Sequence, residues 1–114
     1  MVDVNELAWA FKQLAKHDKD ILTTRQIAIL MRTYVEAEEQ TIRGLSKDLE
    51  IPKSAVVRSV DKLENLHFVK RVPSWDDLRD VYVRTTPNGI VWIRDMKSVI
   101  NKVPTEKTIK GILS

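Results

Sequence analysis

The spacing of apolar residues changes at about residue 67 of this chain and changes back at about residue 86. Before the first change apolar residues recur every three or four positions, which is typical of helices with one buried face. After it, Phe68 to Val72 is predicted to be a strand, and Val81 and Val83 alternate with Tyr82 and Arg84, which predicts a second strand. The residues 73–80 between them are polar and rich in turn formers. A helical pattern restarts at Thr86-Pro87. This order predicts a mainly α fold with one small β-hairpin.

Local signals place the ends of the predicted helices. Thr23 followed by Gln26 has the form of a capping box, Thr41 can cap a short helix, and Pro52 suits the first turn of the next one. The predicted helices cover 3–17, 23–35, 41–49, 52–66 and 86–102, with one more turn or short helix within 105–114. The third and fourth helices are short and joined by a tight turn, which is the helix-turn-helix layout, and the hairpin that follows makes it winged.

The composition is that of one ordinary globular domain. The 114 residues are long enough to bury a hydrophobic core, and the absence of cysteine excludes disulfides and thiolate metal sites. No apolar run approaches the length of a membrane span, and residues 1–6 lack the apolar block of a secretory signal. We expect a single cytoplasmic domain over 1–114 with no membrane association.

The placement of charge points to an anionic partner. The formal net charge is +3, and bases outnumber acids between Thr41 and Arg71, whereas the preceding residues 36–40 are acidic. A basic middle next to an acidic segment suggests a face for nucleic acid. On charge alone, a pair of solvated helices explains the pattern equally well.

The second helix of a helix-turn-helix presents its first turns to base edges in the major groove. Lys53 and Arg58 could donate to guanine, Ser54 could donate or accept, and Ala55 or Val57 could touch a thymine methyl. Bases on the preceding helix and on the hairpin would add contacts to phosphate and to the minor groove, which attracts arginine where it is narrow. The candidate DNA-binding residues are Arg43, Lys47, Lys53, Ser54, Ala55, Val57, Arg58, Lys70, Arg71, Asp77, Arg79 and Arg84.

Two stretches within 22–93 resemble the MarR family of bacterial winged-helix regulators. One is PKSAVVRSVDKLENLHFVKR, with its Val-Asp-x-Leu-Glu pattern, and the other is PSWDDLRDVYVRTTPNGIVWI. In the second, Asp77 and Arg79 match the family's Asp-x-Arg wing loop, and Thr86, Pro87 and Gly89 match its Thr-Pro-x-Gly helix start. His67 stands where the family usually has a glycine, at a site that often needs a left-handed backbone.

The resemblance implies a triangular homodimer with intertwined first and last helices. Each recognition helix would enter a major groove and each wing arginine a minor groove. It also implies a small-molecule effector site between the terminal helices and the winged core. The sequence shows no convergent polar residues that would identify the ligand.

Dimerisation has independent support in the terminal segments. A winged core over 23–86 is too small to cover the apolar stripes of both 1–20 and 87–114, so these stripes would seek a partner copy. The alternative is that they fold back on their own core. The candidate interface residues are Leu7, Phe11, Leu14, Ile93, Met96 and Ile100.

We therefore predict a sequence-specific regulator of transcription that binds double-stranded DNA, as a homodimeric repressor. Helix 52–66 would lie in the major groove and hairpin 68–85 at the minor groove. We predict no enzymatic activity and no cofactor, because His17 and His67 lie in different elements and the three glycines form no phosphate loop. The alternative is a winged-helix module that binds protein, as an adaptor or anti-repressor, and the acidic wing loop favours it.

Overall fold

The computed structural model describes residues 3–77 and 79–101. The chain divides into two compact units. One is Leu22–Ile93, which contains the predicted winged core, and the other combines the segments on either side of it. Residues 102–114, with the predicted final turn and the end of the predicted segment 87–114, lie outside the described residues. The expected single domain over 1–114 stays a prediction.

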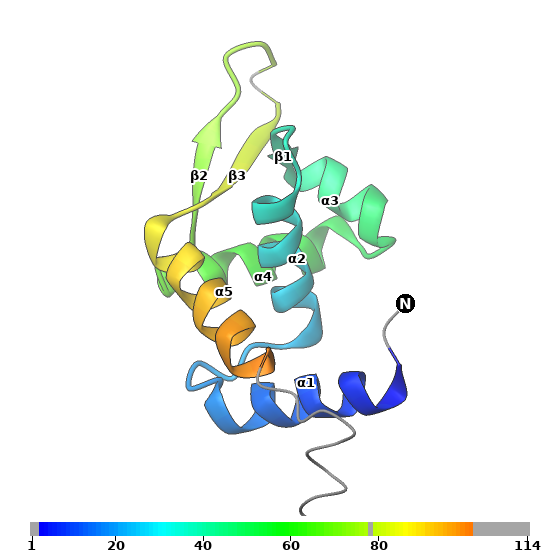
Figure 1. The fold of residues 1–114 in the computed structure, drawn as a ribbon. Helices are drawn as coiled ribbons and strands as arrows, with labels where there is room; N and C mark the ends of the chain where they lie inside the picture. Colours follow the sequence, from blue (N-terminus) through cyan, green and yellow to red (C-terminus); the bar gives the residue numbers. More distant parts are fainter. Residues whose placement is uncertain (1–2, 78, 102–114) are drawn as a thin grey trace, which may run out of the picture. The chain divides into compact units, whose positions relative to one another are not determined.

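The unit Leu22–Ile93 has the predicted order of elements. It holds α2 (Thr24–Val35), β1 (Gln40–Thr41), α3 (Ile42–Leu49), α4 (Lys53–Asn65), β2 (Val69–Pro73), β3 (Val81–Thr85) and the start of α5 (Pro87–Ile100) (Figure 1). The other unit contains α1 (Val4–His17). The mainly α winged-helix fold is confirmed.

The sheet has one strand more than the predicted hairpin. β1 pairs antiparallel with β3 through Gln40↔Val83 and Thr41↔Tyr82, so the strand order is β1-β3-β2. Two residues are too few to show an alternating pattern, which is why the sequence did not predict this strand. Its pairing anchors the start of α3 to the wing.

The helix caps follow local sequence. Thr23 Oγ1 accepts from the Gln26 N–H at 3.2 Å, and Gln26 Oε1 accepts from the Thr23 N–H at 2.9 Å, which completes the predicted capping box. Thr41 Oγ1 accepts from the Gly44 N–H at 2.8 Å. Pro52 corrects the prediction by one residue: it is the N-cap of α4, with an extended ψ of 144°, and not a member of its first turn.

The core of this unit joins the helices to the sheet. Ile29 and Leu30 of α2 are completely buried, as are Leu45 of α3 and residues 56, 60 and 63 of α4. Val69 and Val83 supply the inward face of the wing strands. Burial of each such side chain contributes about 1.5–3 kcal/mol before conformational entropy is subtracted. Because one side of α4 is buried in this core, the orientation of the helix is fixed and its opposite side faces outward.

Two left-handed residues make the turns on either side of α4. Glu50 has φ 55° and ends α3, and the Ser46 hydroxyl donates to the Ile51 carbonyl at 2.6 Å across the turn. His67 has φ 63°, as the resemblance implied. The Phe68 N–H donates to the Leu63 carbonyl at 2.9 Å, so the chain leaves α4 and enters β2 within a few residues. None of the helices in residues 3–77 and 79–101 is both long and apolar enough to cross a bilayer.

Candidate nucleic-acid interface

The first two turns of α4 present three polar side chains to solvent. Lys53, Ser54 and Arg58 are exposed, and none of them makes a hydrogen bond or ion pair within the described part of the chain. Val57 is half-buried. Ala55 is only 5% exposed and belongs to the core, so it is not a base contact. The buried stripe of α4 also takes in Ser59, one turn beyond Ala55, and is wider than the sequence suggested.

The N-terminus of α4 has free donors. Pro52 makes no side-chain cap, and its carbonyl accepts from the N–H groups of Ala55 and Val56. The N–H groups of Lys53 and Ser54 have no acceptor among the described residues. Free N–H groups at the positive end of a helix dipole favour an anion such as phosphate.

The bases of α3 differ in their surroundings. Lys47 is exposed and has no partner in the described residues. Arg43 Nη2 lies 2.8 and 2.9 Å from the two carboxylate oxygens of Asp80, which ties α3 to the wing. Arg43 and Asp80, together with Lys53 and Arg79, line an open cavity of about 270 Å³. Its lining carries more positive than negative charge.

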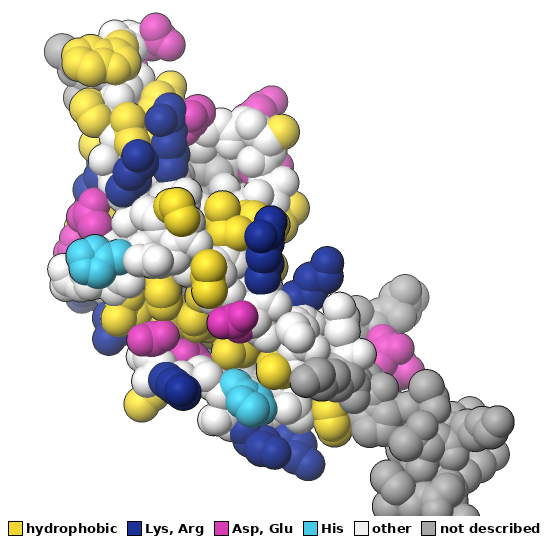
Figure 2. Space-filling view, turned by 60° about the vertical axis from the view of Figure 1, so that its left-hand side comes forward, with side chains coloured by type: hydrophobic (Ala, Val, Ile, Leu, Met, Phe, Trp, Pro, Cys, Tyr) yellow, Lys and Arg dark blue, Asp and Glu magenta, His cyan; other side chains and the backbone are white. Residues whose placement is uncertain are grey.

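The wing strands place two bases opposite each other. Lys70 and Arg84 are directly paired in the β2–β3 register, and both are exposed. Arg84 Nη2 lies 2.7 Å from Glu39 Oε1, and hydrogen bonds with Glu39 raise the pKa of Arg84. Glu39 therefore neutralises Arg84, whereas Lys70 has no partner among the described residues. Figure 2 shows Lys and Arg side chains close together below the tip of the wing.

Arg71 is already paired within the chain. Its guanidinium lies 2.6 Å from Glu64 Oε1 and 2.6 Å from Asp61 Oδ1, and only about a quarter of its side chain is exposed. Burial lowers the pKa of Arg71, but the hydrogen bonds and negative charges of the two acids raise it more. Arg71 therefore ties β2 to α4. The sequence missed this role, although both acids belong to the Val-Asp-x-Leu-Glu stretch.

The wing loop holds one arginine in a fixed orientation. Arg79 Nε and Nη2 each lie 3.0 Å from a carboxylate oxygen of Asp77, which also accepts from the Arg79 backbone N–H at 3.0 Å. These hydrogen bonds lower the pKa of Asp77 and raise that of Arg79. The Arg79 side chain remains 83% exposed. Asp77 is therefore a positioning residue for Arg79 and not itself a candidate contact.

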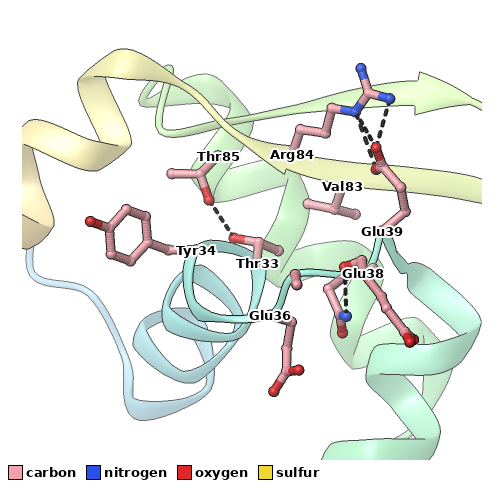
Figure 3. Close-up of a pocket in the computed structure, with 10 residues that line it drawn as sticks. Thr33, Tyr34, Glu36, Glu38, Glu39, Val83, Arg84 and Thr85 are labelled. Carbon is pink, nitrogen blue, oxygen red and sulfur yellow. Dashed lines mark hydrogen bonds and ion pairs between the residues drawn. The ribbon is translucent and has the colours of Figure 1, made fainter.

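A cavity on another part of the sheet is unsuited to nucleic acid. It has a volume of about 270 Å³ and lies between the end of α2, the segment before β1, and β3 (Figure 3). Glu36, Glu38 and Glu39 line it, and Arg84 is already paired with Glu39. Three carboxylates repel a phosphate, so the basic face of α3, α4 and the wing is the better interface.

The predicted dimer residues fall into two groups. On α1, Leu7 and Phe11 are exposed, at 50% and 57%, and Leu14 is half-buried. On α5, Ile93 and Met96 are only 6% and 7% exposed, and Ile100 is half-buried. Ile93 and Met96 are covered by the chain's own atoms, so they are not free interface residues. Helical spacing gives the apolar stripe but does not tell which part of it the same chain covers.

Residues 22–89 match a family model described as a winged helix DNA-binding domain. No protein of curated function is similar enough in sequence to count as a match. Among solved structures, a transcriptional regulator from Thermotoga maritima is 25% identical, with a TM-score of 0.71, over 94% of this chain and 69% of that one. A MarR transcriptional regulator from Methanosarcina mazei is 26% identical, with a TM-score of 0.68, over 83% of this chain and 66% of that one. S. aureus MepR in complex with DNA is 20% identical, with a TM-score of 0.73, over 94% of this chain and 85% of that one.

Proposed function

The chain belongs to the winged-helix DNA-binding domain family, and on that premise we propose that it is a transcriptional regulator that recognises a specific sequence in duplex DNA. MarR-family regulators are among its structural neighbours, as the resemblance implied. The observation that carries the proposal is the unpaired, exposed set Lys53, Ser54 and Arg58 on the first two turns of α4. In a helix-turn-helix these positions face base edges in the major groove.

Each part of the interface would have its own role. Lys53 and Arg58 would donate to guanine O6 and N7, and Val57 would contact a thymine methyl. Lys47 and Lys70, which are exposed and unpaired within the described residues, would contact phosphates. Arg79, held by Asp77, would enter the minor groove beside the site of α4.

We propose that the active form is a homodimer. Val4, Leu7 and Phe11 form an exposed apolar stripe on α1, and an isologous dimer would cover it with the same stripe of a second copy. Two α4 helices related by a twofold axis would read half-sites about 34 Å apart. A dimer bound across such a site would act as a repressor by occluding the promoter. S. aureus MepR, which shares the fold, has been seen in complex with DNA.

Selection of bound duplexes from a random pool tests the function directly. We expect a palindrome whose half-sites lie about one helical turn apart. Binding should weaken steeply with salt, because each neutralised phosphate contributes about −0.9 to the log–log slope. No enrichment, together with no duplex binding at low salt, would refute the proposal.

Sedimentation equilibrium at micromolar concentration tests the dimer. We expect the wild type to sediment at twice its chain mass of 13.2 kDa and Phe11→Glu to shift toward the monomer. Glu6→Gln, an exposed change on the same helix, is the matched control. A wild-type monomer would remove the homodimer from the proposal while leaving duplex binding to be judged by selection.

The protein-binding alternative has less support than the wing sequence suggested. Of the acids around Arg79, Asp77 is bound to Arg79 and Asp80 to Arg43, so within the described residues only Asp76 has no partner. The acidic character of the loop is thus largely neutralised within the chain. A flat salt response with retained binding to a protein would favour the alternative.

A further inference from the structure

An open cavity of about 450 Å³ lies between the N-terminus of α2 and α4. Its lining includes Thr24, Arg25, Arg58 and Ser59 and no acidic residue. Of these four residues, only Arg58 belongs to the interface predicted from sequence. The cavity lies within the unit Leu22–Ile93, so a single compact unit determines its shape.

Ser59 carries a polar atom that the protein does not satisfy. The residue is 7% exposed, and its hydroxyl has no hydrogen-bond partner among residues 3–77 and 79–101. The Ser59 oxygen is not among the fully buried, unpaired side-chain atoms of the described residues, so it is open to the cavity and free to pair with a group there. Since Ser59 lines the cavity, a group entering it would complete the missing hydrogen bond.

The N-terminus of α2 supplies further donors. Thr23 caps the Gln26 N–H, and the Ile27 N–H donates to the Thr23 carbonyl, which leaves the N–H groups of Thr24 and Arg25 without an acceptor in the described residues. The first turn of α2 contains no acid. A free helix N-terminus attracts an anion through these N–H groups and the helix dipole.

Arg25 occupies an unfavourable position for an isolated helix. A cation in the first turn opposes the helix dipole, where an acid would be stabilising. Arg25 is nevertheless exposed there and forms no ion pair in the described part of the chain, and the same holds for Arg58 across the cavity. A bound anion between the two would remove both the repulsion and the conflict with the dipole.

We propose that this cavity binds one phosphodiester group of the DNA backbone. The inference rests on the proposed function and adds α2 to the interface. The phosphate oxygens would accept from the Arg25 guanidinium, from the free N–H groups of Thr24 and Arg25, and from the Ser59 hydroxyl. Arg58, on the same side of α4, would lie between this phosphate and the base edges. One phosphate at the groove edge would thus fix how deeply α4 enters the groove.

The salt dependence of duplex binding tests the role of Arg25. We expect Arg25→Gln to reduce the magnitude of the log–log slope by about 0.9 per protomer, and to weaken selected and random duplexes by the same factor, about tenfold. Ser59→Ala should weaken binding without changing the slope, because it removes a neutral donor. Arg94→Gln, an equal change of charge on an exposed residue of α5, should leave the slope unchanged.

Neutralising single phosphates locates the contact. Methylphosphonate would replace the phosphates of the selected duplex one at a time. At one position in each half-site, methylphosphonate should lower the affinity of the wild type but not that of Arg25→Gln. The variant has already lost the ion pair between Arg25 and that phosphate. The inference would be overturned if Arg25→Gln kept the salt-dependence slope of the wild type. It would also be overturned if the affinity losses from Arg25→Gln and from methylphosphonate were additive at every phosphate. Either result leaves the proposed function intact.

Inorganic phosphate separates the two proposals if no duplex binds. Titration followed by the amide signals of Thr24 and Arg25 should then give saturable shifts that Arg25→Gln abolishes, which would support an anion site without DNA binding. Unchanged amide signals in the wild type would refute the site as well.

Discussion

Arg71 of β2 and Glu64 of α4 are joined twice: the Arg71 backbone N–H donates to Glu64 Oε2 at 3.0 Å, and Nη1 lies 2.6 Å from Oε1. Arg71 Nη2 also reaches Asp61 Oδ1 at 2.6 Å. The wing strand is therefore fixed to the second half of the helix whose first two turns present Lys53, Ser54 and Arg58 to solvent. This contact sets the angle between α4 and the wing.

Arg71→Ala should lower the free energy of unfolding by about 1–2 kcal/mol, because it leaves two partly exposed carboxylates without their partner. Chemical denaturation measures the loss. The neighbouring Lys70→Ala is the matched control and should stay within about 0.5 kcal/mol of the wild type, since Lys70 is exposed and unpaired in the described residues. Equal stability of the two variants would contradict a structural role for Arg71.

Arg58→Ala should relax or abolish sequence preference, because a bidentate base contact is worth about 1–3 kcal/mol of discrimination. Lys47→Ala should weaken all duplexes similarly, as loss of a phosphate contact does. Fluorescence anisotropy measures the affinity of each variant for selected and for random duplexes. Equal losses for Arg58→Ala on both kinds of duplex would mean that Arg58 contacts phosphate and not bases.

Arg79→Ala should weaken binding most on duplexes whose contacted minor groove is narrow, because such grooves concentrate negative potential. Arg79→Lys keeps the charge but loses the paired hydrogen bonds to Asp77, and we expect it to be intermediate. Binding to duplexes with A-tract and G·C-rich flanks measures the difference. Unchanged affinity on every sequence would exclude Arg79 as a contact.

The pKa of Asp77 should lie below the value of about 3.9 for an unperturbed aspartate, because Arg79 donates hydrogen bonds to its charged form. A carboxyl group whose pKa is lower in the folded state stabilises the fold above the unfolded-state pKa. That contribution is lost as the pH falls through the folded-state pKa. An NMR titration of the Asp77 carboxyl carbon gives the value. A normal pKa, or the same titration in Arg79→Ala, would contradict the pairing in solution.

Gly89→Ala should destabilise the protein by about 1–3 kcal/mol through overpacking. A Cβ at this position would overlap the Phe68 carbonyl oxygen and meet Thr85 Cγ2 at 2.9 Å. The Phe68 carbonyl also accepts from the Thr86 N–H at 3.0 Å, so it cannot move without breaking that bond. Thermal unfolding compares the variant with Asn88→Ala, an exposed change in the same turn that should be nearly neutral. Equal melting temperatures would show that α5 adjusts at little cost.

Local chemistry determined what the sequence revealed by itself. Helical spacing, the Thr23–Gln26 capping box and the left-handed His67 each depend on residues within a few positions of one another. The same signals placed Lys53, Ser54 and Arg58 on the outward side of α4. The winged helix and the exposed polar face of α4 were therefore predictable.

Only the tertiary structure decided which charged and apolar side chains are free. Arg71 and Arg43 are both bases in the basic stretch 41–71, but the structure ties the first to α4 and the second to Asp80. Burial of Ala55 and Ile93, the strand β1, and the cavity beside Arg25 also depend on segments that are distant in sequence. Periodicity tells which side of a helix is apolar, whereas the packing of other elements decides what covers it.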